Sequence, residues 1–198
     1  MSQYNLAHLT LGNDYVQAAI QDDEALLLFA AIKCMRLRTV LEVGALHGYS
    51  AQNFLAAVGP KGKVISVDIN AVTPLDVNHT TIQSPIQDVD PALLPVLDLV
   101  FFDAHVYDEQ LAFFKRAREQ GKITPKTIIA LHDTGLFPGP VVPGCKQVTG
   151  GWMHEAVERR MVNYLVEAGY HAFCANDDGG SPPRKGITLM QQFARFET

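Results

Sequence analysis

Short apolar runs that end near an acidic residue alternate with helical patterns along this chain. This alternation restricts the fold more than any other feature. The runs "KVISVDI" (63–69), "LDLVFFDA" (97–104) and "TIIALHD" (127–133) are almost continuously apolar, as expected of strands buried on both faces of a sheet. Helical patterns such as "DEQLAFFKRAREQ" (108–120) separate them. The pattern predicts an α/β fold with a mostly parallel sheet.

The remaining elements complete a Rossmann-like, doubly wound sheet of seven strands with an antiparallel strand in its C-terminal part. One crossover is unusual, because only a dozen residues separate Asp68 from the third strand, and Pro74 and Asn78 interrupt them. We therefore expect the helix of this crossover to be short or missing. The other expected elements are helices at 24–35, 50–58 and 152–169 and strands at 39–44, 80–84, 170–176 and 186–193.

Length and charge favour one small-molecule-binding domain. The chain has 198 residues, 47% of them hydrophobic. This suffices for a single domain, spanning 1–198, with one sizeable hydrophobic core. Within it we expect an N-terminal helical segment (1–36) and a Pro/Gly-rich lid or substrate loop (135–151). The net charge of -5 is spread without blocks of like charge, which argues against a nucleic-acid or membrane partner. Lacking a signal peptide or a membrane-spanning run, the chain is expected to be cytoplasmic; a homodimer is compatible with the sequence.

The stretch "LEVGALHGYS" (41–50) follows the first strand and predicts a ligand-binding turn. Gly44 and Gly48 allow close backbone approach and a tight strand-to-helix turn. Asp68 ends the second strand about 20 residues later, where a carboxylate can accept hydrogen bonds from both ribose hydroxyls. A glycine loop coupled to such an acid indicates an adenosine ligand. The alternative is a tight turn with an incidental acid.

The same loop favours one adenosine-containing ligand over a dinucleotide. Leu46 stands where the middle glycine of a dinucleotide fingerprint belongs. Glu42 lies inside the strand that leads into the loop, and an acid there suits a cationic ligand better than a diphosphate. S-adenosylmethionine is such a ligand, since it carries a sulfonium, an ammonium and an adenosine.

These motifs resemble a known family. "LEVGALHGYSA" followed by "VISVDIN" is similar to the first two motifs of class I S-adenosylmethionine-dependent methyltransferases. The E-x-G-x-x-x-G-Y-S form resembles the catechol O-methyltransferase-like group of small-molecule O-methyltransferases. The likeness covers about residues 25 to 135 and is weaker in the C-terminal third. It implies that Glu42, Gly44 and Ser50 hold the methionine end and Asp68 the ribose.

A third motif extends the implied cofactor site. "SPIQD" (84–88) is similar to the family motif that lies against the adenine, which would place Gln87 and Ile86 there. The alternative for Gln87 is a solvated loop amide. The full set of expected cofactor contacts is Glu42, Gly44, Ala45, Gly48, Tyr49, Ser50, Asp68, Ile69, Ile86, Gln87 and Asp103.

Acids and histidines end the two strands beside the glycine loop. Asp103, His105, His132 and Asp133 should converge there, and such a cluster can bind Mg²⁺ or, through the imidazoles, another divalent metal. The resemblance implies Asp103 and Asp133 as metal ligands that orient the substrate hydroxyl and lower its pKa. Thr134 then stands where the family often has asparagine. An ungapped alignment would instead make His132 the second ligand.

One residue departs from the family pattern. The lysine that serves as base in the family is Val106 here, so catechol-type chemistry is in doubt. His105 is the nearest substitute, because its ordinary pKa of about 6.5 suits a general base at neutral pH. We expect His105 and Asp103 to be the catalytic pair. Alternatively, Asp103 contacts only the cofactor and His132 is a packed strand-end residue.

The sequence thus predicts a metal-assisted transfer of a methyl group to a hydroxyl of a small molecule. The acceptor would be chosen by the lid and by aromatic side chains such as Phe137, Trp152 and Tyr107. Three alternatives stay open. They are a metal-dependent oxygenase or hydrolase that uses the Asp/His cluster, a non-catalytic S-adenosylmethionine-binding protein, and an N-methyltransferase that needs no metal.

Overall fold

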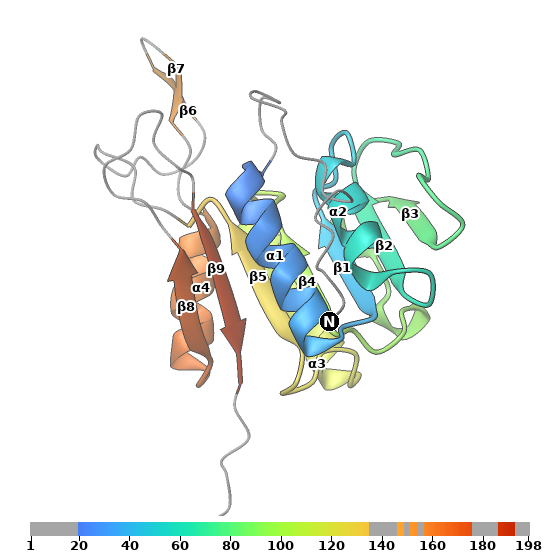
Figure 1. Cartoon of the computed structure of the whole chain (residues 1–198). Coiled ribbons are helices and arrows are strands. Elements are labelled where there is room, and N and C mark those ends of the chain that lie inside the picture. The colour runs from blue at the N-terminus through green and yellow to red at the C-terminus, as the bar shows by residue number, and fades with distance from the viewer. Residues whose placement is uncertain (1–19, 135–145, 149–150, 154–156, 176–185, 193–198) are drawn as a thin grey trace, which may run out of the picture.

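The computed structural model describes residues 20–134, 146–148, 151–153, 157–175 and 186–192, and their seven-stranded sheet is the predicted one (Figure 1). The strand order is β3-β2-β1-β4-β5-β9-β8. The first five of these strands run parallel, and β9 is antiparallel to both β5 and β8. The strands are β1 Thr39–Val43, β2 Lys63–Asp68, β3 His79–Gln83, β4 Leu99–Phe102, β5 Ile128–His132, β8 His171–Ala175 and β9 Ile187–Gln191.

In the described part of the chain, two helices cover each face of the sheet, as expected of a doubly wound fold. Helices α1 (Asp22–Met35) and α2 (Tyr49–Val58) pack against one face through residues such as Phe54, which meets Phe101 of β4 edge to face at 5.4 Å between ring centroids. Helices α3 (Tyr107–Glu119) and α4 (Val157–Glu167) cover the other face. Among the described residues, no helix is long and apolar enough to cross a membrane.

The crossover after β2 contains no helix, which confirms the expectation for this segment. Residues 69–78 form bends and a turn before β3 begins. Two short 3-10 helices, η2 (Ile86–Asp88) and η3 (Pro91–Leu93), take the place of a full helix between β3 and β4. The crossovers on both sides of β3 are therefore abbreviated, and the loop after β3 reaches the sheet edge where the glycine turn lies.

One segment differs from the sequence prediction. We expected one long loop up to 151 and a helix that begins at Trp152, but Lys146–Val148 (β6) and Gly151–Met153 (β7) form an antiparallel hairpin. Only two residues connect these strands, a length that suits a tight hairpin, and valine and tryptophan favour strands. Three-residue strands are too short for an alternating pattern to reveal them. The rest of the expected lid, like residues 1–19, lies outside the described residues.

Strand register sets the position of the functional groups. Val43 at the end of β1 pairs with Val67 of β2 and Phe102 of β4, and Phe102 pairs with Leu131 of β5. The residues that follow these four strands therefore lie along one edge of the sheet, as in other parallel α/β sheets. The glycine turn, Asp68, Asp103 and Asp133 come together at this edge.

Candidate active site

The turn after β1 passes directly against the end of β4. Gly44 has φ +91°, and a Cβ there would lie 2.5 Å from the carbonyl oxygen of Asp103. Gly48, with φ +76°, precedes the first residue of α2. Only glycine satisfies both demands at position 44, a left-handed backbone and an approach without a side chain. This close approach brings the glycine turn and the residues after β4 to one place.

Asp68 holds the glycine turn in position. One carboxylate oxygen, Oδ2, accepts hydrogen bonds from the backbone N–H groups of Ala45 at 3.0 Å and Leu46 at 2.9 Å. The other, Oδ1, accepts from the N–H of Asn70 at 2.8 Å. Leu46 has φ 47°, a left-handed conformation that these bonds stabilise. The acid after β2 therefore couples directly to the loop after β1, as the spacing of the two motifs predicts.

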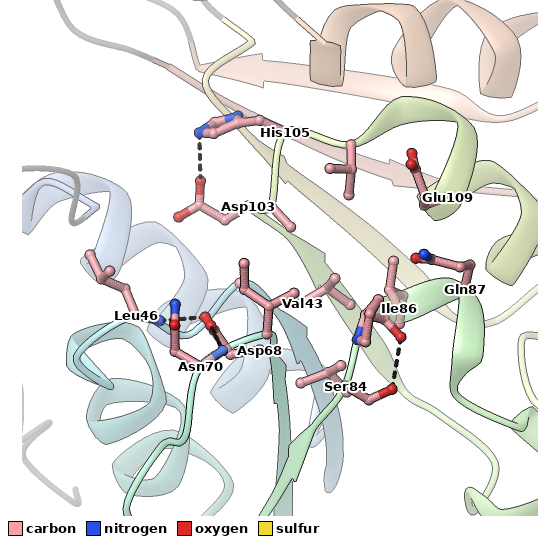
Figure 2. A pocket seen from close by; sticks show the side chains of 16 residues that line it. Val43, Leu46, Asp68, Asn70, Ser84, Ile86, Gln87, Asp103, His105 and Glu109 are labelled. Carbon is pink, nitrogen blue, oxygen red and sulfur yellow. Dashed lines mark hydrogen bonds and ion pairs between the residues drawn. The ribbon is translucent and has the colours of Figure 1, made fainter. Parts of the chain in front are cut away.

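A pocket of about 450 Å³ opens between these loops (Figure 2). This volume is in the range of small-molecule and cofactor sites. Apolar side chains form much of its wall, and a few polar groups face it from different loops. The lining residues are Val43, Gly44, Leu46, Val67, Asp68, Ile69, Asn70, Ser84, Pro85, Ile86, Gln87, Asp103, Ala104, His105, Val106 and Glu109.

The structure places the expected cofactor residues in two groups. One group lines the pocket: Gly44, Asp68, Ile69, Ile86, Gln87 and Asp103. The others do not line it and belong to β1, the glycine turn or the start of α2: Glu42, Ala45, Gly48, Tyr49 and Ser50. The Tyr49 hydroxyl, for example, donates to Oδ1 of Asp22 at 2.8 Å. Burial, together with this hydrogen bond, raises the pKa of Tyr49 to about 12.

Glu42 is fully buried behind the pocket. Its carboxylate accepts hydrogen bonds from the hydroxyl groups of Ser50 and Ser66. The hydroxyl oxygen of Ser66 lies 2.8 Å from Nε2 of His79, whose Nδ1 accepts the backbone N–H of Leu75 at 3.1 Å. Burial raises the pKa of Glu42 to about 7, although both hydroxyl groups oppose this effect. Burial lowers the pKa of His79. The side chain of Glu42 therefore changes its protonation state near neutral pH.

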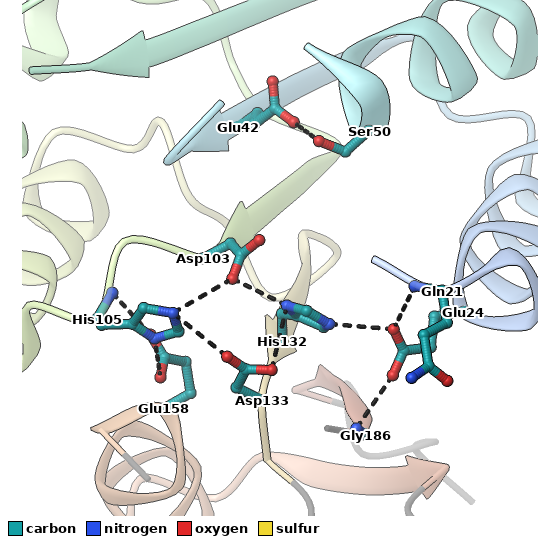
Figure 3. A network of polar contacts seen from close by, with 10 residues as sticks. All are labelled: Gln21, Glu24, Glu42, Ser50, Asp103, His105, His132, Asp133, Glu158 and Gly186. Atoms are coloured by element: carbon teal, nitrogen blue, oxygen red, sulfur yellow. Dashed lines mark hydrogen bonds and ion pairs between the residues drawn. The ribbon is translucent and has the colours of Figure 1, made fainter. Parts of the chain in front are cut away.

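A second group of polar side chains lies where β4 and β5 end (Figure 3). Nε2 of His105 is 3.3 Å from Oδ2 of Asp133 and 3.8 Å from Oδ1 of Asp103. Nδ1 of His105 lies 3.0 Å from Oε2 of Glu158, which belongs to α4. Among the described residues, Asp103, His105 and Asp133 each present a ligand atom within 4.8 Å of the other two. This donor set fits a divalent metal that accepts both oxygen and imidazole ligands.

Acidic neighbours control the protonation of His105. Burial by itself would lower the pKa of this imidazole, but the hydrogen bond to Glu158 and the charges of Glu158, Asp103 and Asp133 outweigh it. The pKa of His105 rises to about 9, so the ring is protonated at neutral pH unless a bound cation replaces its proton. The residue also has φ 55°, a left-handed conformation that is uncommon outside glycine.

His132 lies beside the same two aspartates, and its expected role as a metal ligand stays a prediction. Its Nδ1 lies 2.9 Å from Oδ1 of Asp103, and its Nε2 lies 3.0 Å from Oε2 of Glu24 in α1. Burial lowers the pKa of His132, but the charges of Asp103 and Asp133, aided by the hydrogen bonds to Asp103 and Glu24, raise it well above its usual value. Both ring nitrogens of His132 thus have carboxylate partners, but His132 does not line the pocket, whereas His105 does. Thr134 is buried and bonds to Thr188 at 2.7 Å between the hydroxyl oxygens.

Sequence reasoning missed three acids of this site. Glu24 bridges His132 and the backbone N–H of Gly186, Glu158 holds His105, and Glu109 lines the pocket. A capping pattern at the start of α1 gave some signal for Glu24. No local pattern singles out Glu158 or Glu109. Of the three expected acceptor-pocket aromatics, Tyr107 begins α3, while Phe137 and the side chain of Trp152 lie outside the described part.

The segment that runs from β1 to the end of β5 is similar to a known protein domain. Residues 41–134 match the sequence model of a family described as a methyltransferase domain. Among solved structures, the O-methyltransferase TomG from Streptomyces achromogenes, in complex with S-adenosylmethionine, is 17% identical, with a TM-score of 0.61. The match covers 91% of this chain and 84% of TomG.

Two structures that contain S-adenosylhomocysteine have the same fold. The methyltransferase PaMTH1 from Podospora anserina is 14% identical with a TM-score of 0.62, and the match covers 89% of this chain and 81% of PaMTH1. An O-methyltransferase from Bacillus cereus is 15% identical with a TM-score of 0.61, and the match covers 89% of this chain and 83% of that protein. In each case the likeness extends over most of both chains.

Proposed function

Since residues 41–134 match the sequence model of a methyltransferase domain and the sheet has the Rossmann-like order, we propose that this chain is a class I S-adenosylmethionine-dependent methyltransferase that methylates a hydroxyl group of a small molecule. Two of the structures similar to this chain are O-methyltransferases by name. The observation that carries the proposal is that the glycine turn, Asp68, Asp103 and His105 all line one pocket. No relative named above supports an oxygenase or a hydrolase.

The pocket supplies groups suited to the methyl donor. When bound, S-adenosylmethionine supplies a methyl group on a positively charged sulfonium. Asp68 would accept hydrogen bonds from the ribose, and Gln87 and Ile86 would lie against the adenine. Behind the pocket, Glu42 and Ser50 support the glycine turn, and Asp103 adds negative charge beside it. The pocket volume and the acids that face a cationic ligand support this assignment.

His105 is the proposed base of the reaction. A hydroxyl oxygen becomes a good nucleophile once its proton is removed, and Nε2 of His105 would take that proton. Asp103 and Asp133 would stabilise the resulting imidazolium. A positively charged donor in the neighbouring pocket opposes protonation of the ring before the reaction. The chain's other contribution is alignment, because the glycine turn fixes the donor side relative to β4.

A metal-assisted variant of this chemistry is the second candidate, supported by the donor set Asp103, His105 and Asp133. Mn²⁺ or another divalent metal at this place would lower the pKa of an acceptor hydroxyl. His105 would then be a ligand through Nε2 and not the base. We propose a small-molecule acceptor in either case, in keeping with the net charge of -5, which disfavours nucleic acid.

Release of S-adenosylhomocysteine tests the proposal. The protein is incubated with S-adenosylmethionine and a panel of phenols, catechols, aliphatic alcohols and matched amines, with Mn²⁺ or with a chelator. We expect turnover with hydroxyl compounds and its loss in His105→Asn, a substitution that tolerates the left-handed backbone. Turnover that vanishes in chelator supports the metal-assisted variant. Methylation of amines alone, unchanged in His105→Asn, would contradict the proposal.

A further inference from the structure

The geometry points to Glu158 as a positioning residue that fixes the imidazole of His105 with its Nδ1 proton bound and its Nε2 facing Asp103 and Asp133. This inference rests on the proposed role of His105. It adds to the site a residue from α4, which lies 53 residues further along the chain. Glu158 would act through His105 and not by touching substrate or donor.

Both oxygens of Glu158 bind the same residue. Oε1 accepts the backbone N–H of His105 at 3.0 Å, and Oε2 lies 3.0 Å from Nδ1 of its ring (Figure 3). An ionised carboxylate only accepts hydrogen bonds, so Nδ1 must be the donor of this pair. Nε2 is then the ring position left to exchange a proton or to bind a metal. The Glu158 side chain is completely buried, which prevents water from replacing it.

Glu158 lies in the first turn of α4, beside the loops that carry the acid–imidazole cluster. It is the second residue of this eleven-residue helix. The next two side chains also reach the site. Arg159 donates to the carbonyl oxygen of Thr134 at 3.0 and 3.3 Å, and the guanidinium of Arg160 lies 4.1 Å from the ring centroid of Tyr107. The first turn of α4 therefore docks onto both loops that carry the acid–imidazole cluster.

Backbone strain provides a second, independent argument. His105 and Asp133 both have φ 55°, and their side chains face each other at 3.3 Å. A left-handed conformation is strained for a residue other than glycine. The bond from the His105 N–H to Glu158 helps to hold this conformation. Such strain persists where the surroundings fix a side chain in one direction, and here that direction is toward Asp103 and Asp133.

Proton NMR of the full chain, with ¹⁵N-labelled histidine, tests the inference. An Nδ1 proton held by a buried carboxylate gives a downfield, slowly exchanging signal, which His105→Asn assigns by its loss. Glu158→Gln keeps an oxygen that can accept the backbone N–H, but its amide cannot satisfy both donors. Glu167→Gln is the matched control, because Glu167 is an exposed residue of the same helix.

We expect the signal in wild type and in Glu167→Gln and its loss in Glu158→Gln. With the hydroxyl acceptor that the panel above identifies, kcat of Glu158→Gln should fall about 10²-fold while KM changes little, because orientation of the base is lost and binding is kept. A wild-type protein without the signal overturns the inference even if Glu158→Gln does not fold. So does a signal that Glu158→Gln retains.

The same samples separate this inference from the proposed function. Titration of each with S-adenosylhomocysteine reports on the donor site alone. If wild type does not bind it but the Nδ1 signal behaves as expected, the proposed function fails and the positioning of His105 stands. If wild type binds it and the signal is the same in Glu158→Gln, the inference fails and the proposed function stands.

Discussion

Single residues determine how closely the ends of β1 and β4 approach each other at the pocket. Gly44 combines a left-handed backbone with a Cβ position only 2.5 Å from the carbonyl oxygen of Asp103. Gly121 also has positive φ, +68°, but a Cβ there meets no atom within 4 Å. Substituting alanine at Gly44 and at Gly121 therefore separates two costs: that of a left-handed backbone with a side chain, and that of the clash between a Cβ at position 44 and the residue after β4.

We predict that Gly44→Ala destabilises the protein by about 3 kcal/mol or more and that Gly121→Ala costs about 1 kcal/mol. The backbone penalty is common to both, and the collision with the end of β4 belongs only to the first. Urea unfolding followed by circular dichroism measures both values. Equal losses in the two variants would show that the loop after β4 can move aside.

The buried acid behind the pocket makes stability depend on pH. Burial raises the pKa of Glu42 from 4.5 to about 7, so the folded protein binds more protons than the unfolded chain between these two values. The contribution of Glu42 to the free energy of unfolding is therefore highest at low pH and falls as the pH rises from about 4.5 to 7. The shift corresponds to about 3 kcal/mol.

We predict that Glu42→Gln removes this dependence. The free energy of unfolding of the variant, relative to wild type, should rise by about 3 kcal/mol between pH 5 and pH 8, since the amide carries no charge to bury. Urea unfolding at several pH values measures the difference. Glu119→Gln, at an exposed position in α3, is the control and should follow the wild-type curve. A constant offset between Glu42→Gln and wild type would contradict the assignment.

At the scale of elements, Glu24 joins three of them. Its carboxylate accepts the backbone N–H of Gln21 before α1 at 2.8 Å and that of Gly186 before β9 at 3.0 Å. It also lies 3.0 Å from Nε2 of His132 at the end of β5. The side chain is 4% exposed, so the three donors depend on this one acceptor for their hydrogen bonds.

We predict that Glu24→Gln costs about 3 kcal/mol, because an amide cannot accept from all three donors and one of them, such as the buried Nε2 of His132, loses its carboxylate partner. Thermal and urea unfolding measure the loss, with the exposed Glu119→Gln again as the control. Faster hydrogen exchange should appear at β9 and at the first turn of α1 together. Exchange that increases at only one of them would show that Glu24 does not couple these elements.

The sequence predicted the strands well for a physical reason. Strands such as 97–104 and 127–133 are buried on both faces, so their apolar runs are long and end in polar residues at the ligand-binding edge. The hairpin of β6 and β7 was not predicted, because three-residue strands are too short to show an alternation of apolar and polar residues. The start of α4 was misplaced for the same reason, since Trp152 belongs to β7.

The site was only partly predictable. The coupling of the glycine turn to Asp68 follows from the spacing of two strand ends, and the structure shows it as hydrogen bonds to Ala45 and Leu46. The carboxylate partners of the two histidines could not be predicted from the sequence, because Glu24 is 108 residues from His132 and Glu158 is 53 residues from His105. Only the packing of α1 and α4 on opposite faces of the sheet brings these acids to the cluster.

At the scale of the whole molecule, the proposed function requires that the pocket binds the adenosine-containing methyl donor. Isothermal titration calorimetry with S-adenosylhomocysteine tests it most directly, with NAD as the dinucleotide control and Asp68→Ala as the variant. We predict one site per chain for S-adenosylhomocysteine and no heat with NAD. Asp68→Ala should weaken binding by about 10–100-fold, since a charged acceptor for the ribose and the glycine turn is lost. No binding by wild type, or binding of NAD instead, would contradict the assignment of this pocket to the methyl donor.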